Sequence, residues 1–490
     1  MTDDRPHLAV IGAGPAGLAA TVAAASHGVR VTLIDSAAWA GGQFYRQPAT
    51  ELNTGRPQAL HHQWRTWERL RDALARHVEA GRVTHVTDHH VWLVERRLSR
   101  RADAVDRVGP RDAFTVHALL GPDEAPAEVR ADAVLLATGG YEKVLPFPGW
   151  TVPGVLTAGG AQAMLKGTLA VSGRTAVVAG TGPLLLPVAT GLAAAGVEVA
   201  ALVESADPKA FVRRTRALAA QPGKVAEGAR YATQLLRHRV KLLTRHAVVE
   251  AHGDDRLEAV TVAALDSDGR VRSGTERRIA CDTLAIGHGM LPHTDLAETL
   301  GCGLDGVDVQ VDDEQRTDVP GVWAAGETTG IGGAALSLAE GHIAGRSAAA
   351  RLNGTEPDPS SWATAAKSRT KLREFFAVLD TVYVPPARWT DLVTDDTVVC
   401  RCEEVTGGAI REAVDGLGAG DVRTVKLLTR AGMGWCQGRM CGPAVAGLAG
   451  CELAPSRRPF ARPVPLGVLA RAGESEADRP TAAPPDVLPD

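Results

Sequence analysis

The sequence predicts an α/β protein with two dinucleotide-binding domains and a smaller C-terminal domain that holds a metal centre. Residues 8–35 run in the order apolar stretch, glycine turn, alanine-rich stretch and second apolar stretch, and residues 174–204 repeat this order. The order is typical of a strand, a tight turn, a helix and a parallel strand. Five of the seven cysteines lie between Cys400 and Cys451. With 490 residues, the chain has room for about three domains of about 100–200 residues.

The composition excludes several classes of protein. The 53 basic and 57 acidic residues give a net charge of −4, which does not indicate a nucleic-acid or anionic-membrane partner. No apolar run approaches the roughly 18 residues of a membrane-spanning helix. The polar N-terminal segment MTDDRPH leads directly into an apolar stretch, unlike a signal peptide. We therefore expect a cytoplasmic protein, in which a cysteine cluster binds metal rather than forming disulfides.

The first glycine turn, GAGPAG, has the residues that dinucleotide binding requires. Gly12 allows the tight turn, Gly14 lets the backbone approach a pyrophosphate, and Gly17 lets the helix pack on the strand. The start of the following helix presents free N–H groups and a positive dipole end to the phosphates. Asp35 ends the second apolar stretch, where a carboxylate can bind a ribose hydroxyl. Together these features predict a dinucleotide site.

Three later segments contain further candidate contacts. The paired glycines of GGQFYRQ would let the chain approach a flat ring, although a surface turn explains them as well. The stretch ADAVLLATGG is typical of a buried strand, and so is GVWAAGE, which ends in glycine and an acid. A carboxylate there can bind the ribityl chain of a flavin, and the following helix start can stabilise a reduced ring. The candidate residues are Gly41, Gly42, Gln43, Ala137, Thr138, Gly139, Gly326 and Glu327.

The second glycine turn repeats the first incompletely. Gly180 and Gly182 match the first two glycines, and Glu204 stands at the ribose position, but Leu185 replaces the third glycine. A leucine there prevents the helix from packing as closely on the strand. The pattern predicts the fold, while three outcomes stay open for the site: a bound NAD(P), an adenine nucleotide in a structural role, or no ligand.

Four cysteines of the C-terminal region predict a metal centre. The first two are separated by one residue, and the second pair follows more than thirty residues later. Four thiolates on loops fit an iron–sulfur cluster or zinc. Structural zinc sites usually use CxxC pairs, which favours the cluster, and unliganded thiols are the remaining alternative. The predicted ligands are Cys400, Cys402, Cys436 and Cys441, whereas Cys281, Cys302 and Cys451 are expected to be packing residues.

These patterns divide the chain into predicted units. The first nucleotide-binding domain is expected to be discontinuous, with the second inserted into it. A proline-rich segment with one helical stretch is expected to be a linker, and the acidic, proline-rich C-terminus to be disordered. The predicted ranges are 5–165 and 283–353 for the first domain, 170–282 for the second, 354–396 for the linker, 397–455 for the metal domain and 470–490 for the tail.

The combined motifs resemble one specific family. GAGPAGLAA, GGQFYRQ, LLATGGYEKVLPFPGWTVPGVLTAGGAQ, GVWAAGE and the four-cysteine region are similar to the FAD-dependent subunits of hetero-oligomeric amino-acid and amine dehydrogenases. That family includes the A-type chain of opine oxidase, the B-type chain of hydrogen cyanide synthase and the alpha chains of hydroxyproline and proline dehydrogenases. The resemblance implies a thioredoxin reductase-like flavoprotein fold with two dinucleotide-binding domains. It also implies a [2Fe–2S] domain like that of bacterioferritin-associated ferredoxin.

The resemblance also implies roles for individual residues. The four cysteines Cys400, Cys402, Cys436 and Cys441 would ligate the cluster. FAD would contact Gly12, Gly14, Gly17, Asp35, Gly42, Gln43, Thr138, Gly139, Gly326 and Glu327. The chain departs from the wider pattern at two positions. Glu327 stands where most relatives have Asp, and Leu185 stands where a nicotinamide site would have glycine.

The resemblance implies that the chain is an electron-transfer subunit. It would accept the electrons released when a C–N bond in an amino acid, opine or related amine is oxidised. The family's substrate is oxidised mainly on a D-amino-acid-oxidase-like flavoprotein partner, and a small ferredoxin-like protein is a further expected partner. One alternative is a stand-alone NAD(P)H-dependent FAD oxidoreductase. Another is a scaffold with vestigial sites whose cluster senses redox state. A disulfide reductase is excluded, since no cysteine precedes Cys281.

Overall fold

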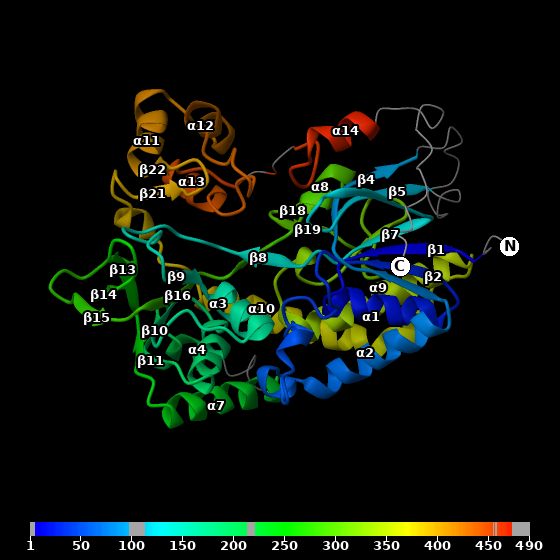
Figure 1. Ribbon diagram of the computed structural model, residues 1–490, viewed down its shortest axis with the longest axis horizontal. Helices are drawn as coiled ribbons and strands as arrows, with labels where there is room; N and C mark the ends of the chain where they lie inside the picture. Colours follow the sequence, from blue (N-terminus) through cyan, green and yellow to red (C-terminus); the bar gives the residue numbers. More distant parts are fainter. Residues whose placement is uncertain (1–4, 98–112, 213–220, 454, 456–457, 473–490) are drawn as a thin grey trace, which may run out of the picture.

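The computed structural model describes the chain except residues 1–4, 98–112, 213–220, 454, 456–457 and 473–490. Two parallel five-stranded sheets, each covered by helices, form most of the molecule, and a small helical domain follows them (Figure 1). The structure is thus mixed α/β, as expected. In the part of the chain that it describes, no helix is long and apolar enough to cross a bilayer.

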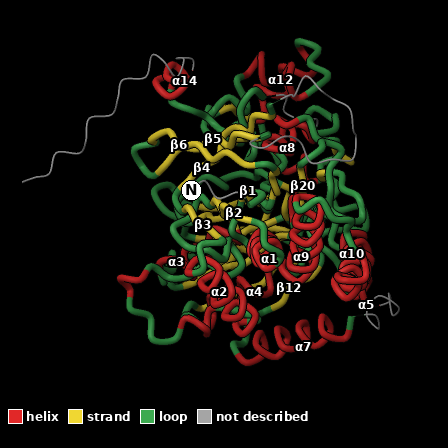
Figure 2. Tube along the Cα trace, turned by 90° about the vertical axis from the view of Figure 1, so that its right-hand side faces the viewer, coloured by secondary structure: helices red, strands yellow, loops and turns green. Residues whose placement is uncertain are grey.

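The first sheet has the strand order β20-β7-β1-β2-β3, with all strands parallel. The helices α1 and α9 lie side by side against it, α2 packs on α1, and α10 lies beyond α9 (Figure 2). The strands are β1 His7–Ile11, β2 Arg30–Ile34, β3 Val83–Val86, β7 Ala133–Leu136 and β20 Val322–Ala324. The helices are α1 Pro15–Ser26, α2 Trp64–Glu79, α9 Gly333–Leu352 and α10 Ala363–Val382.

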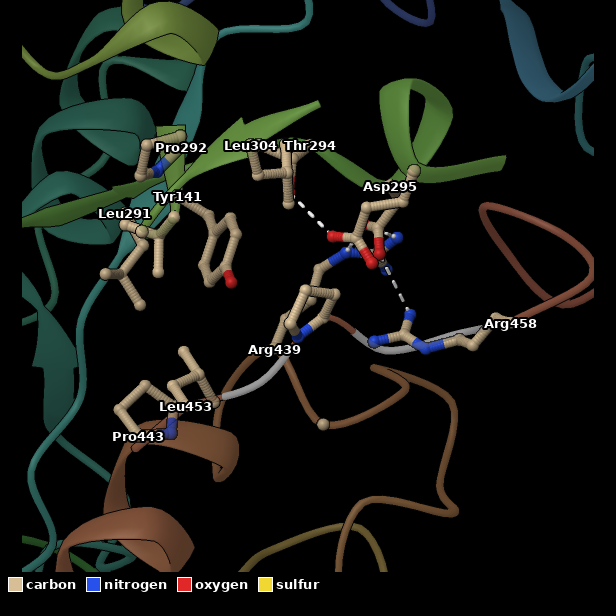
Figure 3. A pocket seen from close by; sticks show the side chains of 15 residues that line it. Tyr141, Leu291, Pro292, Thr294, Asp295, Leu304, Arg439, Pro443, Leu453 and Arg458 are labelled. Atoms are coloured by element: carbon tan, nitrogen blue, oxygen red, sulfur yellow. Dashed lines mark hydrogen bonds and ion pairs between the residues drawn. The ribbon is translucent and has the colours of Figure 1, made fainter. Parts of the chain in front are cut away.

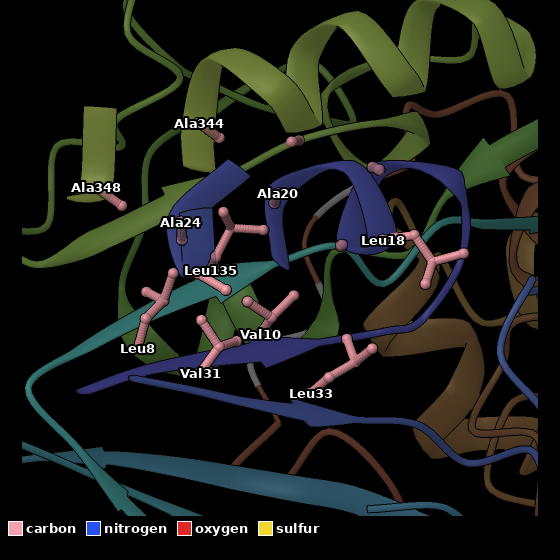
Figure 4. Packing of buried hydrophobic residues seen from close by; sticks show 14 of the residues in the cluster. Leu8, Val10, Leu18, Ala20, Ala24, Val31, Leu33, Leu135, Ala344 and Ala348 are labelled. Atoms are coloured by element: carbon pink, nitrogen blue, oxygen red, sulfur yellow. The ribbon is translucent and has the colours of Figure 1, made fainter. Parts of the chain in front are cut away.

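Small side chains let α1 and α9 approach the sheet and each other closely. Strands β1 and β7 are buried and, apart from His7, apolar, because both faces of a parallel sheet are covered. A Cβ atom built on Gly341 of α9 would lie 2.1 Å from the carbonyl oxygen of Ala16, and one on Gly345 would lie 2.3 Å from that of Ala20. Alanines fill the rest of the contact above the leucines and valines of the sheet (Figure 4). Any larger residue at either glycine would separate the two helices.

The second sheet has the order β12-β11-β10-β16-β9 and is also parallel. Its strands are β9 Val155–Thr157, β10 Thr175–Gly180, β11 Glu198–Glu204, β12 Leu242–Thr244 and β16 Thr283–Gly287. Its helices are α3 Ala158–Thr168, α4 Leu185–Ala194, α5 Lys209–Val212 and α7 Pro222–Arg237. Each sheet is accompanied by three antiparallel strands: β4 His89–Arg96, β5 Phe114–Leu120 and β6 Ala125–Ala131, and β13 His246–His252, β14 Ala259–Ala264 and β15 Arg277–Ala280.

The predicted boundaries between the two nucleotide-binding domains, at 165 and 283, are wrong. Strand β16 pairs with β10 from Thr283 to Gly287, and β9 pairs with the other side of β16, so both complete the second sheet. The chain passes between the sheets through an antiparallel pair, β8 Gly140–Glu142 and β17 Met290–Pro292 (Figure 1). An apolar strand does not indicate which of two similar sheets it joins, because that depends on pairing between distant residues.

The segment 354–396 is not the linker that its composition predicts. Helix α10 packs against α9 and buries Leu372, Phe375 and Leu379. Spacings of three and four residues place these side chains on one face of the helix. Helix α10 contacts α5 of the second domain as well as α9, and the ring centroids of Phe375 and Phe211 are 5.6 Å apart. The helical part of the segment is therefore packed against both nucleotide-binding domains.

The C-terminal domain has its own small core, which includes two of the cysteines, Cys400 and Cys441. Its elements are β21 Val398–Cys400, β22 Val405–Thr406, α11 Gly407–Arg411, the π-helical turn η6 Glu412–Gly416, α12 Val422–Thr429 and α13 Gly442–Leu448. The remaining short elements are α8 Asp295–Leu300, β18 Leu304–Asp305 and β19 Asp308–Val309, and the 3-10 turns Thr50–Leu52, Pro57–Leu60, Glu327–Thr329, Pro359–Trp362 and Trp389–Leu392.

The predicted disordered tail begins too early. Helix α14, Leu466–Ala472, includes the first three residues of that range. Val468 is buried in a cluster with Trp92 and Leu119, and this apolar contact orders the segment. The rest of the predicted tail, 473–490, lies outside the described residues.

Candidate active site

The first glycine turn is held by direct contact between backbone atoms. The N–H of Gly12 donates to the carbonyl oxygen of Ile34, over 2.8 Å. A Cβ atom on Gly12 would lie 2.2 Å from the carbonyl oxygen of Ala137, and one on Gly17 would lie 1.8 Å from that of Gly12. Strand β1, strand β7 and helix α1 therefore meet without side chains between them. A Cβ on Gly14, in contrast, would meet only ordinary contacts, the nearest at 4.0 Å.

Asp35 closes this turn from the neighbouring strand. Its Oδ2 accepts from the N–H of Ala13 over 2.5 Å, and its Oδ1 accepts from the N–H of Ala37 over 2.7 Å. Burial raises the pKa of the Asp35 carboxyl, while the two N–H groups oppose that rise. Each oxygen has a second lone pair, so the carboxylate can also accept hydrogen bonds from ribose hydroxyls.

The GGQ segment lies directly on the glycine turn. The N–H of Gly41 donates to the carbonyl oxygen of Ala13 over 2.8 Å, and a Cβ on Gly42 would lie 2.8 Å from the Cα of Gly14. Gly42 has a φ of +58°, which few other residues adopt. The side chain of Gln43 accepts from Arg46 Nε over 3.1 Å. The two glycine segments together form a backbone cradle.

The remaining predicted contacts lie on the same edge of the sheet. Gly12, Asp35, Ala137 and Gly326 follow the carboxyl ends of β1, β2, β7 and β20, which are neighbours in the sheet. Ligands of open α/β sheets bind at this edge. Gly139 has a φ of +74° and open space where a Cβ would be. The structure thus brings the predicted FAD contacts to one edge, and the open, glycine-lined cradle fits a dinucleotide.

Glu327 is placed at the start of the long helix α9. Burial raises the pKa of its carboxyl, and the N–H of Gly333, the first residue of α9, opposes that rise. The Gly326 that precedes it has a φ of +84°, and a Cβ there would lie 2.8 Å from the Cβ of Ala16. The acid can therefore reach a ribityl chain lying between the glycine turn and the start of α9.

The four predicted cluster ligands come together as two pairs. The sulfur atoms of Cys402 and Cys436 are 3.8 Å apart, and the thiols of Cys400 and Cys441 are hydrogen-bonded. Burial and the neighbouring cysteines raise the pKa of Cys441. Thiolates in such pairs need a bound cation to stay deprotonated. Among the described residues, no three His, Cys, Asp or Glu side chains gather closely enough to hold a single metal ion. Two pairs of thiolates instead fit a cluster of two irons.

Comparison with known proteins identifies the family. Residues 6–366 match the family described as "Pyridine nucleotide-disulphide oxidoreductase", and residues 398–449 match "BFD-like [2Fe-2S] binding domain". The chain belongs to this flavin oxidoreductase family. FAD and a [2Fe–2S] cluster are therefore its cofactors, as predicted from the sequence.

Several members of the family are similar over most of their length. The chain is 32% identical to hydrogen cyanide synthase subunit HcnB of Pseudomonas protegens, over 88% of this chain and 89% of that protein. It is 33% identical to the A-type chain of opine oxidase from Agrobacterium tumefaciens, over 89% and 84%. The crystal structure of L-proline dehydrogenase from P. horikoshii shares the fold, with a TM-score of 0.63, 19% identity and coverage of 96% of this chain and 81% of that one.

Two residues that hold the loop of Glu327 in this flavin oxidoreductase were not predicted from the sequence. Glu340, 1% exposed on α9, accepts from the N–H of Gly326 over 2.9 Å. Arg373 of α10 forms an ion pair with Glu340 at 2.6 Å and donates to the carbonyl oxygens of Thr329 and Gly330. The pair clamps the loop that contains Glu327. An acid among the small and apolar residues in the first half of α9 was the signal in the sequence.

The second glycine turn of this flavin oxidoreductase repeats the first, with a displaced helix. Glu204 accepts from the N–H groups of Gly182 and Ala206, whereas Asp35 accepts from those of Ala13 and Ala37. The contact inside the second turn is therefore one residue further along, since Gly182 corresponds to Gly14. Helix α4 begins at Leu185, five residues after Gly180, whereas α1 begins three residues after Gly12. The side chain of Leu185 is 2% exposed, and the close contact made by Gly17 leaves no room for it. The helix start is therefore shifted from the phosphate position.

An aromatic side chain also lies beside this second turn. The Cβ of Tyr383, at the end of α10, lies 3.9 Å from the position of a Cβ on Gly182. Burial and the charge of Glu204 raise the pKa of Tyr383 to about 12. The ring of Tyr383 faces Phe211 at a centroid distance of 6.5 Å. A nucleotide at this turn would have to share the space with Tyr383.

Replacing Gly14 with alanine separates cofactor binding from folding. Gly14 has φ −72° and ψ −174°, which alanine adopts freely, and its Cβ would meet no protein atom closer than 4.0 Å. We expect Gly14→Ala to leave the melting temperature of the apoprotein unchanged and to weaken FAD binding by about tenfold or more, or about 1.4 kcal/mol. Fluorescence titration with FAD measures the loss. The contrasting variant Gly17→Ala should destabilise the apoprotein by about 1–3 kcal/mol, and equal FAD affinity in Gly14→Ala and the wild type would contradict the assignment.

Replacing Cys436 with serine tests the ligand assignment. Cys436→Ser should abolish the visible absorption of the cluster and its iron content, because one iron loses a thiolate. The flavin content should stay the same, since the FAD contacts lie on another domain. Cys451→Ser is the matched control and should retain the cluster. An unchanged spectrum in Cys436→Ser would show that the ligand set is wrong.

Proposed function

We propose that this protein is the FAD- and [2Fe–2S]-containing electron-transfer subunit of a hetero-oligomeric dehydrogenase. The complex would oxidise the C–N bond of an amino acid, an opine or a related amine. The observation that carries the proposal is the presence of an FAD cradle and a four-cysteine centre in one chain. That chain is similar over most of its length to proteins named as components of hydrogen cyanide synthase and opine oxidase.

We propose that a partner chain oxidises the substrate and that this chain transfers the electrons. The residues around the predicted FAD contacts support this division of labour. Flavins exchange electrons in pairs or singly and iron–sulfur clusters exchange them singly, which is the chemistry that the two cofactors supply. The predicted contacts are mainly backbone groups together with the two acids Asp35 and Glu327, which would bind and orient a dinucleotide. The cavity lined by Tyr141, Asp295 and Arg439 includes none of the predicted FAD contacts. This supports binding and oxidation of the substrate on a separate D-amino-acid-oxidase-like chain. A small ferredoxin-like protein is proposed as a further partner.

The proposal predicts that turnover requires two chains. The purified chain alone should not oxidise any member of a panel of amino acids and opines with a dye as electron acceptor. Co-expression with a D-amino-acid-oxidase-like chain should yield a complex that oxidises at least one of them. Substrate turnover by this chain alone would contradict the division of labour.

A stand-alone NAD(P)H-dependent oxidoreductase is the second candidate. The observation that favours it is the second glycine turn, in which Glu204 accepts from two backbone N–H groups, as Asp35 does in the first turn. The shifted start of α4 and the adjacent Tyr383 oppose it.

Anaerobic mixing with NADH or NADPH separates the two candidates. We expect no bleaching of the flavin, because Leu185 and Tyr383 crowd the second turn. Dithionite, which needs no binding site, should bleach the flavin completely and is the control. Rapid bleaching by either nicotinamide nucleotide would instead favour the stand-alone oxidoreductase.

A further inference from the structure

A buried carboxylate, Asp295, joins the flavin-binding loops to the cysteine loop. It is the first residue of α8 and is 8% exposed. Arg439 donates to its Oδ2 from Nε over 2.9 Å and from Nη2 over 2.6 Å, and Arg458 Nη1 lies 3.2 Å from Oδ1. Figure 3 shows both arginines reaching Asp295 from the side of the C-terminal domain. Burial alone would raise the pKa of Asp295, but the hydrogen bond of His293 and the charge of Arg439 lower it to about 2, so the carboxylate is ionised.

On the flavin side, Asp295 is connected through His293. The Nε2 of His293 lies 3.0 Å from Asp295 Oδ2. The backbone N–H of His293 donates to the carbonyl oxygen of Gly139 over 2.9 Å, and its carbonyl oxygen accepts from the hydroxyls of Thr138, over 2.6 Å, and Thr328, over 3.1 Å. His293 thus ties together two of the loops predicted to contact FAD, at residues 138–139 and 326–328.

On the cluster side, Arg439 belongs to the loop between two predicted ligands, Cys436 and Cys441. Its backbone N–H donates to the carbonyl oxygen of Cys436 over 3.1 Å. Its guanidinium leaves the C-terminal domain to form the ion pair with Asp295. Because the planar guanidinium holds the carboxylate through two hydrogen bonds of fixed direction, the position of this loop is set by α8.

The ion pair is not the only attachment of the C-terminal domain. Trp150 Nε1 donates to the carbonyl oxygen of Val398 over 2.5 Å, and the guanidinium of Arg401 lies 5.9 Å from the centre of the Trp150 ring. Loss of the Asp295 charge would therefore leave the domain attached. It would free the loop that holds Cys436 and Cys441 to change its distance and orientation relative to the flavin-binding loops.

We propose that Asp295 is a positioning residue that holds the cysteine loop at a fixed distance from the flavin-binding loops and so sets the rate of electron transfer between the two cofactors. The inference rests on the proposed function. With both cofactors bound, the step concerned would move one electron from the reduced flavin to the oxidised cluster and then to an external acceptor. No bond to Asp295 forms or breaks. Transfer between held groups is sensitive to displacements of about 1 Å, so a loosened loop slows it.

The test compares full-length holoproteins after a pulse of a photochemical one-electron reductant. Flavin and cluster absorbance are followed separately, and the reduction potentials of both are titrated. Asp295→Asn should retain both cofactors and slow flavin-to-cluster transfer by about tenfold or more. The matched control is Glu314→Gln, which breaks a partly buried ion pair with Arg351 at the far end of α9 and should transfer electrons at the wild-type rate.

A double-mutant cycle gives the second measurement. If Asp295 acts through Arg439, the variant Asp295→Asn/Arg439→Gln should be no slower than the slower of the two single variants, because one interaction is lost in all three. A wild-type rate in Asp295→Asn would overturn the inference alone. The inference would also be overturned if the slower rate were fully explained by a changed difference between the reduction potentials of the flavin and the cluster. Absence of flavin-to-cluster transfer in the wild type would instead overturn the proposed function.

Discussion

Direct contact between backbone atoms at the first glycine turn is the constraint on which the flavin domain depends. Carbonyl oxygens of Gly12 and Ala137 occupy the space that side chains would need at Gly17 and Gly12. Helix α9 adds two contacts of the same kind through Gly341 and Gly345 against α1. These approaches bring the carboxyl ends of four strands, the start of α1 and the start of α9 to one place. A cradle built largely from backbone N–H groups can then hold a phosphate-containing cofactor.

The second nucleotide-binding domain shows how much depends on one of these contacts. Its acid, Glu204, accepts from two backbone N–H groups as Asp35 does, although the group inside the turn belongs to Gly182, which corresponds to Gly14. The missing third glycine moves the start of α4, because a leucine side chain cannot enter the space between helix and strand. Tyr383 from α10 then lies beside the turn. The two domains therefore have the same topology, but only in the first is the glycine turn open to a dinucleotide.

Ion pairs connect the flavin-binding loops to the neighbouring helices and to the C-terminal domain. Buried Glu340 and half-buried Arg373 join α9, α10 and the loop of Glu327, and Asp295 joins α8 to the cysteine loop through Arg439. Removing Arg373 would leave the buried carboxylate of Glu340 uncompensated, which costs about 3–5 kcal/mol. Each pair thus fixes the relative position of elements that lie far apart in the chain. The FAD cradle and the cluster are held by different elements, and α8 is one of the links between them.

The sequence by itself determined the α/β class, the family and the two cofactors, because glycine spacing and cysteine spacing are local patterns with a direct chemical meaning. Only the tertiary structure decided which sheet β9 and β16 join, that α10 is packed rather than a linker, and that Glu340, Arg373, His293, Asp295 and Arg439 support the site. Strand pairing and buried ion pairs join residues separated by tens to hundreds of positions. Their partners are chosen by the three-dimensional packing, and no local pattern in the chain specifies them.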